Sequence, residues 1–302
     1  MQYRNLGRTD LQVSSIGLGC VTFGREIDAT TSFAILDHAI ERGITLIDTA
    51  EAYSAGASES VLGKWIADRG ARDNIVLATK VANSLTRERI LESANASLKR
   101  LKTDRIDLFQ LHNWDDDVAL DETLGALDSL VEQGKVRYVG CSNWGAWQLC
   151  KALLAVHERG SVRMQSVQPP FNLVQREIEP DLLPLCSDQQ IGVITYSPLG
   201  AGFLTGKYSR NGEVPEGTRF EVILGHQPIY FTGDGFRIME GLRQKADELG
   251  QSMIQLALSW VFSRPEITSV LIGARHTGHI DQALKAEQVK LPDDVLEQLN
   301  HL

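Results

Sequence analysis

Several features that would indicate other classes of protein are scarce in this sequence. Its 302 residues include only four cysteines, with no CxxC pair, so neither a disulfide framework nor a metal site is expected. No apolar run approaches the ~18 residues of a transmembrane helix. Met1 leads directly into polar residues, without an apolar signal segment, which makes the cytoplasm the expected compartment.

Basic residues are also in deficit. The chain has 30 Lys and Arg against 39 Asp and Glu, a formal net charge of −9. Such a balance disfavours nucleic acid and anionic membranes as partners unless a local basic patch overrides it. With 43% hydrophobic and 23% charged residues, the composition is that of an ordinary globular protein. A rule of ~150 residues per domain suggests two domains, but α/β barrels form one domain of this size.

One pattern recurs along the chain: a short apolar or β-branched run, then a polar residue, then a stretch with helical spacing. There are eight such runs: Ser15–Leu18, Ile44–Ile47, Ile75–Thr79, Ile106–Leu111, Val136–Cys141, 166–167, Ile191–Thr195 and Ser269–Ile272. Strands that alternate with helices indicate parallel βαβ units, and eight of them favour a closed (β/α)₈ TIM barrel. We therefore expect one barrel domain over residues 1–302.

Helices are expected where apolar residues recur at steps of three and four. The candidates are Thr31–Arg42, Arg87–Leu101, Leu120–Glu132, Trp147–His157, Leu182–Gln189, Phe236–Leu249, Met253–Phe262 and Ile280–Lys285. Two segments break the alternation. Residues 1–13 indicate a β-hairpin that plugs the barrel bottom, and residues 208–235 indicate a long glycine-containing loop of undefined role.

The polar residues that end the strands are the candidates for chemistry, because barrel active sites lie at the carboxyl ends of the strands. Asp48, Lys80 and His112 end three consecutive runs, and Tyr53 follows Asp48 in the same loop. A lysine beside a tyrosine favours the phenolate and lowers a pKa that is otherwise near ~10. Taken singly, these residue types more often have structural roles. Together they form a set that can protonate a carbonyl oxygen as hydride arrives at carbon.

The chain resembles the aldo/keto reductase superfamily, in particular its bacterial and channel-β-subunit-like branch. The resemblance covers nearly the whole chain and rests on long motifs in the expected order: 4–14, 47–53, 78–80, 104–112, 134–144, 196–207 and 272–275. It implies that Tyr53 is the general acid, that Lys80 and Asp48 support it, and that His112 orients the substrate carbonyl.

The resemblance also implies a nicotinamide cofactor. Ser142, Asn143 and Gln168 match residues that hold the nicotinamide carboxamide, and Tyr196 matches the aromatic residue that stacks on the ring. The segment 197–207 resembles the pyrophosphate clamp of the family, with Ser197, Leu199, Gly200, Gly202 and Lys207 as its contact residues. No GxGxxG motif follows an early strand, so a Rossmann site is not indicated.

Cofactor preference is expected to depend on residues 273–283. Arg275 stands where the family places a basic residue against the adenosine 2′-phosphate, and a guanidinium can bind phosphate bidentately. NADPH is therefore expected to be preferred, with NADH possible. Gly273, His279 and Gln282 complete the predicted adenosine contacts. His279, Gln282 and Ala283 stand where many members carry Gln, Glu and Asn. The usual adenine contact is therefore not assigned to Ala283, and His279 is a candidate for the phosphate pocket instead.

The expected substrate is a small carbonyl compound. Phe23, Trp114 and Trp144, with aromatic residues of the 208–235 loop, suggest a pocket for an apolar or aromatic aldehyde or ketone, or for a sugar-derived carbonyl. Two other functions stay open: a nicotinamide-binding regulatory or sensor subunit with little turnover, and a barrel lyase or aldolase with Lys80 as Schiff-base nucleophile.

Overall fold

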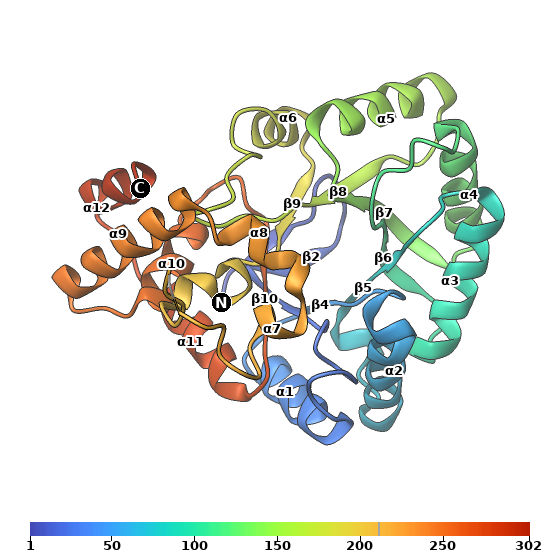
Figure 1. Cartoon of the computed structure of the whole chain (residues 1–302). Helices are drawn as coiled ribbons and strands as arrows, with labels where there is room; N and C mark the ends of the chain where they lie inside the picture. The colour runs from blue at the N-terminus through green and yellow to red at the C-terminus, as the bar shows by residue number, and fades with distance from the viewer. Residues whose placement is uncertain (211) are drawn as a thin grey trace.

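A closed barrel of eight parallel strands forms the centre of the computed structural model, which describes residues 1–210 and 212–302 (Figure 1). The strands pair in sequence order, and the last pairs with the first. They are β3 (Ile16–Gly19), β4 (Leu46–Asp48), β5 (Val76–Val81), β6 (Ile106–Leu111), β7 (Val136–Ser142), β8 (Met164–Gln168), β9 (Gly192–Thr195) and β10 (Ser269–Gly273). The predicted (β/α)₈ barrel with its N-terminal hairpin is confirmed.

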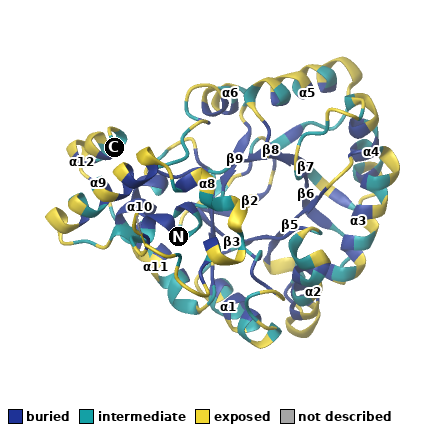
Figure 2. Ribbon diagram, viewed as in Figure 1, coloured by how far each residue is buried: buried dark blue, intermediate teal, exposed yellow. Residues whose placement is uncertain are grey.

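Helices surround the barrel, and their inner sides are buried (Figure 2). The longer ones are α1 (Ala29–Glu41), α2 (Ala57–Arg69), α3 (Arg87–Leu101), α4 (Leu120–Glu132), α5 (Ala146–Arg159), α6 (Leu182–Gln189), α9 (Gly233–Leu249), α10 (Met253–Phe262), α11 (Thr277–Glu287) and α12 (Asp293–Asn300). Helix α3 shows why apolar residues at steps of three and four predict a helix. Its buried residues include Ile90, Ala94 and Leu98, the Thr86 side chain caps its first turn, and Lys102 ends it in a left-handed conformation.

Helix α2 has no counterpart among the expected helices. Its inner face buries Ser58, Glu59 and Gly63 beside Leu62 and Trp65, so polar and small residues interrupt the apolar stripe that periodicity detects. The prediction of one continuous loop over 208–235 is also incomplete. Two short helices, α7 (Arg219–Val222) and α8 (Gln227–Tyr230), interrupt it, and α9 begins at Gly233 rather than at Phe236. Asn211, within the predicted loop, lies outside the described residues.

The N-terminal hairpin closes the end of the barrel opposite the strand carboxyl ends. Strands β1 (Tyr3–Asn5) and β2 (Gln12–Ser14) pair antiparallel, and the hairpin contributes Leu6, Leu11 and Val13 to one apolar cluster. The other buried members of this cluster come from the barrel strands: Leu46, Val76, Ala78, Leu108, Ile194 and Leu271. Leu6 is fully buried and lies directly over Gly192 of β9, where a Cβ would come within 2.5 Å of it.

No helix in the described part of the chain has both the length and the apolar character needed to cross a membrane.

We expect the buried side of the N-terminal hairpin to contribute to the stability of the protein. Leu6→Ala should lower the free energy of unfolding by roughly 2–5 kcal/mol, because it leaves a cavity in a fully buried cluster. Gln12→Ala, on the exposed side of the same hairpin, should change it by no more than about 0.5 kcal/mol. Urea unfolding of both variants measures the difference, and equal effects would show that the hairpin does not close the barrel.

Candidate active site

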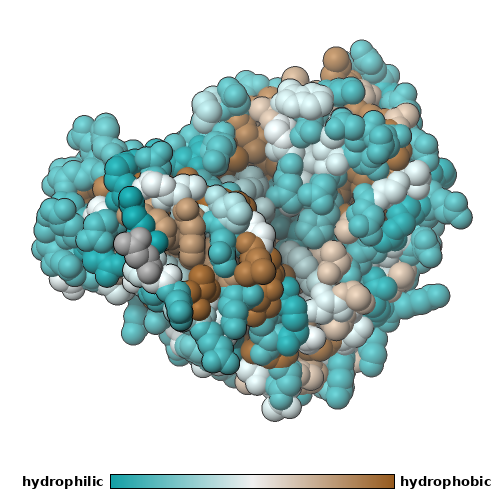
Figure 3. All heavy atoms as spheres, viewed as in Figure 1, coloured by the Kyte–Doolittle hydropathy of each residue, from teal (hydrophilic) through white to brown (hydrophobic). Residues whose placement is uncertain are grey.

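Asp48, Lys80 and His112 lie at the carboxyl ends of the neighbouring strands β4, β5 and β6. The backbone N–H of His112 donates to the carbonyl of Val81, which continues the β5–β6 ladder to this position. Tyr53 begins a short 3₁₀ segment, η1 (Tyr53–Gly56), directly after β4. The space-filling view shows a hollow at the centre of this face of the molecule (Figure 3). The structure therefore brings the four predicted catalytic side chains to one place.

A buried ion pair organises these residues. The Lys80 ammonium donates to Asp48 Oδ1 at 2.5 Å, to the carbonyl of Thr49 at 2.9 Å and to the Tyr53 hydroxyl at 3.2 Å. Its side chain is fully buried. All three contacts of the ammonium thus lie on the β4 end and the turn that follows it, which fixes the direction in which Lys80 faces Tyr53.

The Asp48 carboxylate has two further donors inside the barrel. The side-chain amides of Gln110 and Gln168 donate to Asp48 Oδ2 at 3.2 and 2.9 Å. Gln110 was missed by sequence reasoning, although it stands two residues before His112, and residues at this spacing share one face of a strand. These hydrogen bonds stabilise the charged form of a carboxylate that is removed from water.

Burial alone would lower the pKa of Lys80, but the Asp48 carboxylate and Tyr53 outweigh it, so the net shift is upward. The ammonium therefore stays protonated. A Schiff-base mechanism needs a lysine that can lose its proton, so the aldolase alternative is disfavoured.

The expectation that Lys80 lowers the pKa of Tyr53 below its ordinary value is wrong for the protein alone. Burial of the phenol raises its pKa, Asp48 adds to this, and the attraction of Lys80 offsets only part of the rise. The pKa of Tyr53 is raised from 10.0, and Tyr53 holds its proton at neutral pH.

His112 is neutral in this setting. Its ring meets the Tyr53 ring edge-on, with 5.9 Å between the centroids. Burial and the nearby Lys80 charge lower its pKa from 6.5 to about 4. Within the described part of the chain, its Nδ1 is buried and has no hydrogen-bond partner. A neutral imidazole can donate one hydrogen bond to a substrate oxygen without carrying charge.

The predicted carboxamide-binding residues form one network beside this set. The Tyr196 hydroxyl donates to Asn143 Oδ1 at 2.8 Å, and the Asn143 amide donates to the carbonyl of His112 at 2.9 Å. The Ser142 hydroxyl donates to the carbonyl of Gln168 at 2.8 Å. Burial raises the pKa of Tyr196 to about 12, so its hydroxyl stays a donor.

The segment after Tyr196 turns sharply around its glycines. Gly200 and Gly202 have positive φ values of 57° and 94°, within the 3₁₀ segment η3 (Gly200–Thr205), and Leu199 precedes them. Ser197 has a φ of 55°. The Lys207 ammonium lies beside Gly202, 3.5 Å from the position of an added Cβ. A glycine turn with an adjacent ammonium is suited to an anionic ligand.

The predicted adenosine-binding residues lie where β10 meets α11. The Arg275 guanidinium donates to the carbonyl of Gly217 at 2.8 Å, and its backbone N–H donates to His279 Nδ1 at 3.3 Å. His279 stacks against His276, with ring centroids 3.9 Å apart. His276 was not predicted. Gly273 and Gln282 are exposed, whereas Ala283 is buried in the core.

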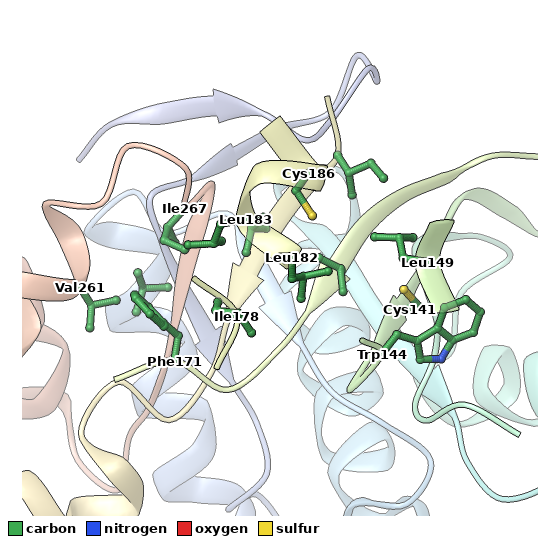
Figure 4. Packing of buried hydrophobic residues seen from close by; sticks show 14 of the residues in the cluster. Cys141, Trp144, Leu149, Phe171, Ile178, Leu182, Leu183, Cys186, Val261 and Ile267 are labelled. Atoms are coloured by element: carbon green, nitrogen blue, oxygen red, sulfur yellow. The ribbon is translucent and has the colours of Figure 1, made fainter. Parts of the chain in front are cut away.

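The three predicted substrate-pocket residues differ in how far they are exposed to solvent. Phe23 is fully buried and Trp144 is 3% exposed, so both belong to the core as the protein stands. Figure 4 shows Trp144 beside Cys141 and Leu149. Trp114 is partly exposed and meets both Trp144 and the 62% exposed Trp147 edge-on.

The aromatic residues of the 208–235 segment pack around Phe203 rather than standing free at the mouth. Phe220 and Tyr230 are buried, and their rings lie 6.4 and 5.8 Å from that of Phe203. Sequence reasoning also missed the ion pair that holds this segment to the rest of the rim. Arg219 of α7 contacts Glu26, before α1, at 3.1 Å.

The chain matches known proteins over nearly its whole length. The aldo/keto reductase family matches residues 15–302. An uncharacterized oxidoreductase of Bacillus subtilis (strain 168), YrpG, is 34% identical over 100% of this chain and 96% of its own length. A probable voltage-gated potassium channel subunit beta of Arabidopsis thaliana is 35% identical over 96% and 92%. The aldo-keto reductase YhdN of Bacillus subtilis is 36% identical over 93% and 87%.

The chain belongs to the aldo/keto reductase family. It is an NAD(P)H-dependent oxidoreductase of the type that acts on carbonyl groups. The relatives include both bacterial oxidoreductases and channel β subunits, as the sequence motifs indicated.

The low pKa of His112 makes the stability of this aldo/keto reductase depend on pH. Between about pH 4 and ~6.5 the unfolded chain binds a proton at this position that the folded protein excludes, so stability falls as the pH is lowered. His112→Asn should reduce this slope by up to about 1.4 kcal/mol per pH unit. Urea unfolding from pH 4.5 to 8.5 measures it. The two slopes should coincide above pH ~7.5, and parallel slopes throughout would contradict the burial of a neutral imidazole.

Proposed function

We propose that this aldo/keto reductase reduces aldehydes or ketones to alcohols with NADPH, using Tyr53 as the proton donor. The observation that carries the proposal is the Tyr53 hydroxyl, 3.2 Å from a buried lysine that is itself paired with Asp48. A proton donor must hold its proton at working pH and release it to a developing alkoxide. Burial meets the first need, and the adjacent ammonium, which stabilises the phenolate, meets the second.

The four catalytic residues then divide the reaction between them. The cofactor supplies hydride to the carbonyl carbon when it is bound. Tyr53 gives its hydroxyl proton to the carbonyl oxygen, Lys80 stabilises the phenolate that remains, and Asp48 keeps Lys80 charged and oriented. His112 donates a hydrogen bond that orients the carbonyl. In alcohol oxidation the proton returns to Tyr53 along the same path.

The residues around the rim fit a dinucleotide. Lys207 and Arg275 lie close enough for the Arg275 charge to help burial lower the pKa of Lys207, and within the described residues neither has a carboxylate within 4.0 Å. Two cations without a protein counter-ion suit a ligand that carries phosphates. In this proposal Ser197, Leu199, Gly200, Gly202 and Lys207 hold the pyrophosphate.

The nicotinamide end and the adenosine end complete the proposed cofactor site. Ser142, Asn143 and Gln168 hold the carboxamide, and Tyr196 supports the ring. Gln168 donates its amide N–H groups to Asp48 and Gln110, so its amide oxygen is the atom suited to a carboxamide N–H. Gly273, Arg275, His279 and Gln282 hold the adenosine part. The guanidinium of Arg275 favours the 2′-phosphate of NADPH over NADH.

The proposed substrate is a small apolar, aromatic or sugar-derived carbonyl compound that contacts Trp114 at the mouth, with Phe23 and Trp144 behind it. Residues 1–302 act as one domain in this proposal, and the cytoplasm is the proposed location. The channel β subunits among the relatives favour one alternative function, a nicotinamide-binding regulatory protein with little turnover.

Measuring turnover distinguishes carbonyl reduction from the alternative regulatory function. With NADPH and a panel of aliphatic, aromatic and sugar aldehydes, the wild-type protein should consume cofactor. Tyr53→Phe should lower kcat by at least about 100-fold, because general acid catalysis contributes 10²–10⁴-fold, while NADPH binding changes little. Fluorescence titration gives the binding constant. NADPH binding without turnover on the whole panel would favour the regulatory function.

Cofactor preference is tested by two matched variants. Arg275→Ala should weaken NADPH binding by about 10- to 100-fold, the cost of about 1.5–3 kcal/mol for a lost charged hydrogen bond, and should leave NADH binding nearly unchanged. Lys207→Ala should weaken both cofactors by similar factors, because both carry the pyrophosphate. Titration of the wild-type protein and of each variant with NADPH and with NADH measures these changes in affinity. Equal affinity of the wild-type protein for NADH and NADPH would contradict the proposal that Arg275 binds the 2′-phosphate.

A further inference from the structure

The backbone directly after Tyr53 has an unfavourable conformation. Ser54 and Ala55 both lie in the left-handed region, with φ values of 51° and 52°, and Gly56 follows at 88°. Two successive non-glycine residues rarely adopt this conformation, because Cβ crowds the following carbonyl. Such a turn persists only where its surroundings hold it in place. The position of the Tyr53 hydroxyl therefore depends on the contacts that hold this turn.

On the N-terminal side the turn is held by Glu51. Its carboxylate accepts hydrogen bonds from the backbone N–H of Ala82 and from the hydroxyl of Ser93, both at 2.7 Å, and from the guanidinium of Arg89. The backbone N–H of Glu51 donates to the carbonyl of Lys80 at 3.3 Å. Glu51 thus links the turn to the end of β5 and to α3. Burial would raise its pKa, but these donors outweigh it and lower the pKa, so the carboxylate is charged.

On the C-terminal side the turn is held by Glu59 of α2. This side chain is fully buried, and it accepts hydrogen bonds from the Thr79 hydroxyl and from Arg100 Nε, both at 2.6 Å. The Arg100 side chain also lies against Gly56, where an added Cβ would come within 2.7 Å of its Cδ. Arg100, like Arg89, belongs to α3.

The Glu51 and Glu59 carboxylates make similar contacts. Glu59 bonds to Thr79 within β5, directly before Lys80, and Glu51 bonds to Ala82 just after the end of β5. Each carboxylate is also paired with an arginine of α3. Resting on the proposed function, we propose that Glu51 and Glu59 are positioning residues, which with α3 hold the strained turn so that the Tyr53 hydroxyl stays within hydrogen-bond distance of Lys80. Neither residue is offered as a proton donor.

If the Glu51 contacts weaken, Ser54 and Ala55 can relax toward ordinary backbone conformations. The Tyr53 hydroxyl then moves away from Lys80, and the ammonium stabilises the phenolate less. A displacement near 1 Å in an active site can cost about 100-fold in rate. The titratable groups that the structure places around Tyr53 are Cys20, Asp48, Lys80, His112 and Tyr196. Of these, Lys80 lowers the pKa of Tyr53, and Asp48 and Cys20 raise it.

Glu51→Gln tests the proposal, because it keeps the shape of the side chain and removes the charge that binds Arg89. We expect kcat for aldehyde reduction to fall by about 10- to 100-fold, with the NADPH dissociation constant changed less than about threefold. The alkaline limb of the pH profile should move to higher pH, since Tyr53 loses part of the stabilisation of its phenolate. Hydrogen exchange of residues 52–57 should become faster.

Asp37→Asn is the matched control. Asp37 joins α1 to α2 through Arg69 at 2.9 Å and Trp65 at 2.7 Å, so Asp37→Asn removes another arginine-paired, helix-linking carboxylate, away from the Tyr53 turn. It should leave kcat within about twofold and the pH profile unmoved. A second variant, Ala55→Gly in the Glu51→Gln background, relieves the left-handed strain without restoring the charge. It should recover at least part of the lost kcat.

Two results would overturn the proposal. One is a Glu51→Gln protein with wild-type kcat and pH profile. The other is equal exchange of residues 52–57 in Glu51→Gln and Asp37→Asn. Failure of the proposed function looks different: the wild-type protein would show no turnover, while faster exchange of the turn in Glu51→Gln would still support the positioning role.

Discussion

The site depends on one interaction, the ion pair between Lys80 and Asp48 inside the barrel. Both side chains are withdrawn from water, at 0% and 2% exposure, which would cost several kcal/mol per ion without compensation. Compensation comes from the 2.5 Å contact between them, from the carbonyl of Thr49, and from the amides of Gln110 and Gln168. These partners come from β6, β8 and the end of β4. The closed barrel is what places them around one carboxylate.

Much of this arrangement can be predicted from the sequence, because it follows from strand ends. The runs that end at Asp48, Lys80 and His112 belong to consecutive parallel strands, and such strands in a barrel place their carboxyl ends on one rim. The fold was predictable for the same reason. Parallel strands that are buried on both faces form recognisable apolar runs, as β5 and β6 show with every residue buried.

Other features could not be predicted, because they depend on burial and on contacts between distant elements. The pKa of Tyr53 is one: spacing reveals the neighbouring lysine, but not how far water is excluded from the phenol. Helix α2 is another, since Glu59 on its inner face is explained only by Thr79 and Arg100. A third is the packing of Phe220 and Tyr230 around Phe203. Lys207 and Arg275 were predicted from the sequence in spite of its acidic net charge, but only the fold shows that these cations from separate segments lie near each other.

The central claim, that Lys80 controls the ionisation of the half-buried Tyr53, can be measured directly. The chain has six tyrosines, so an NMR titration with ¹³Cζ-labelled tyrosine, assigned with Tyr53→Phe, resolves the Tyr53 phenol. We predict that its pKa lies above 10.0 in the wild-type protein and rises further in Lys80→Met, because burial and the Asp48 charge then act without the ammonium. A Tyr53 pKa that is the same in both proteins would contradict the account.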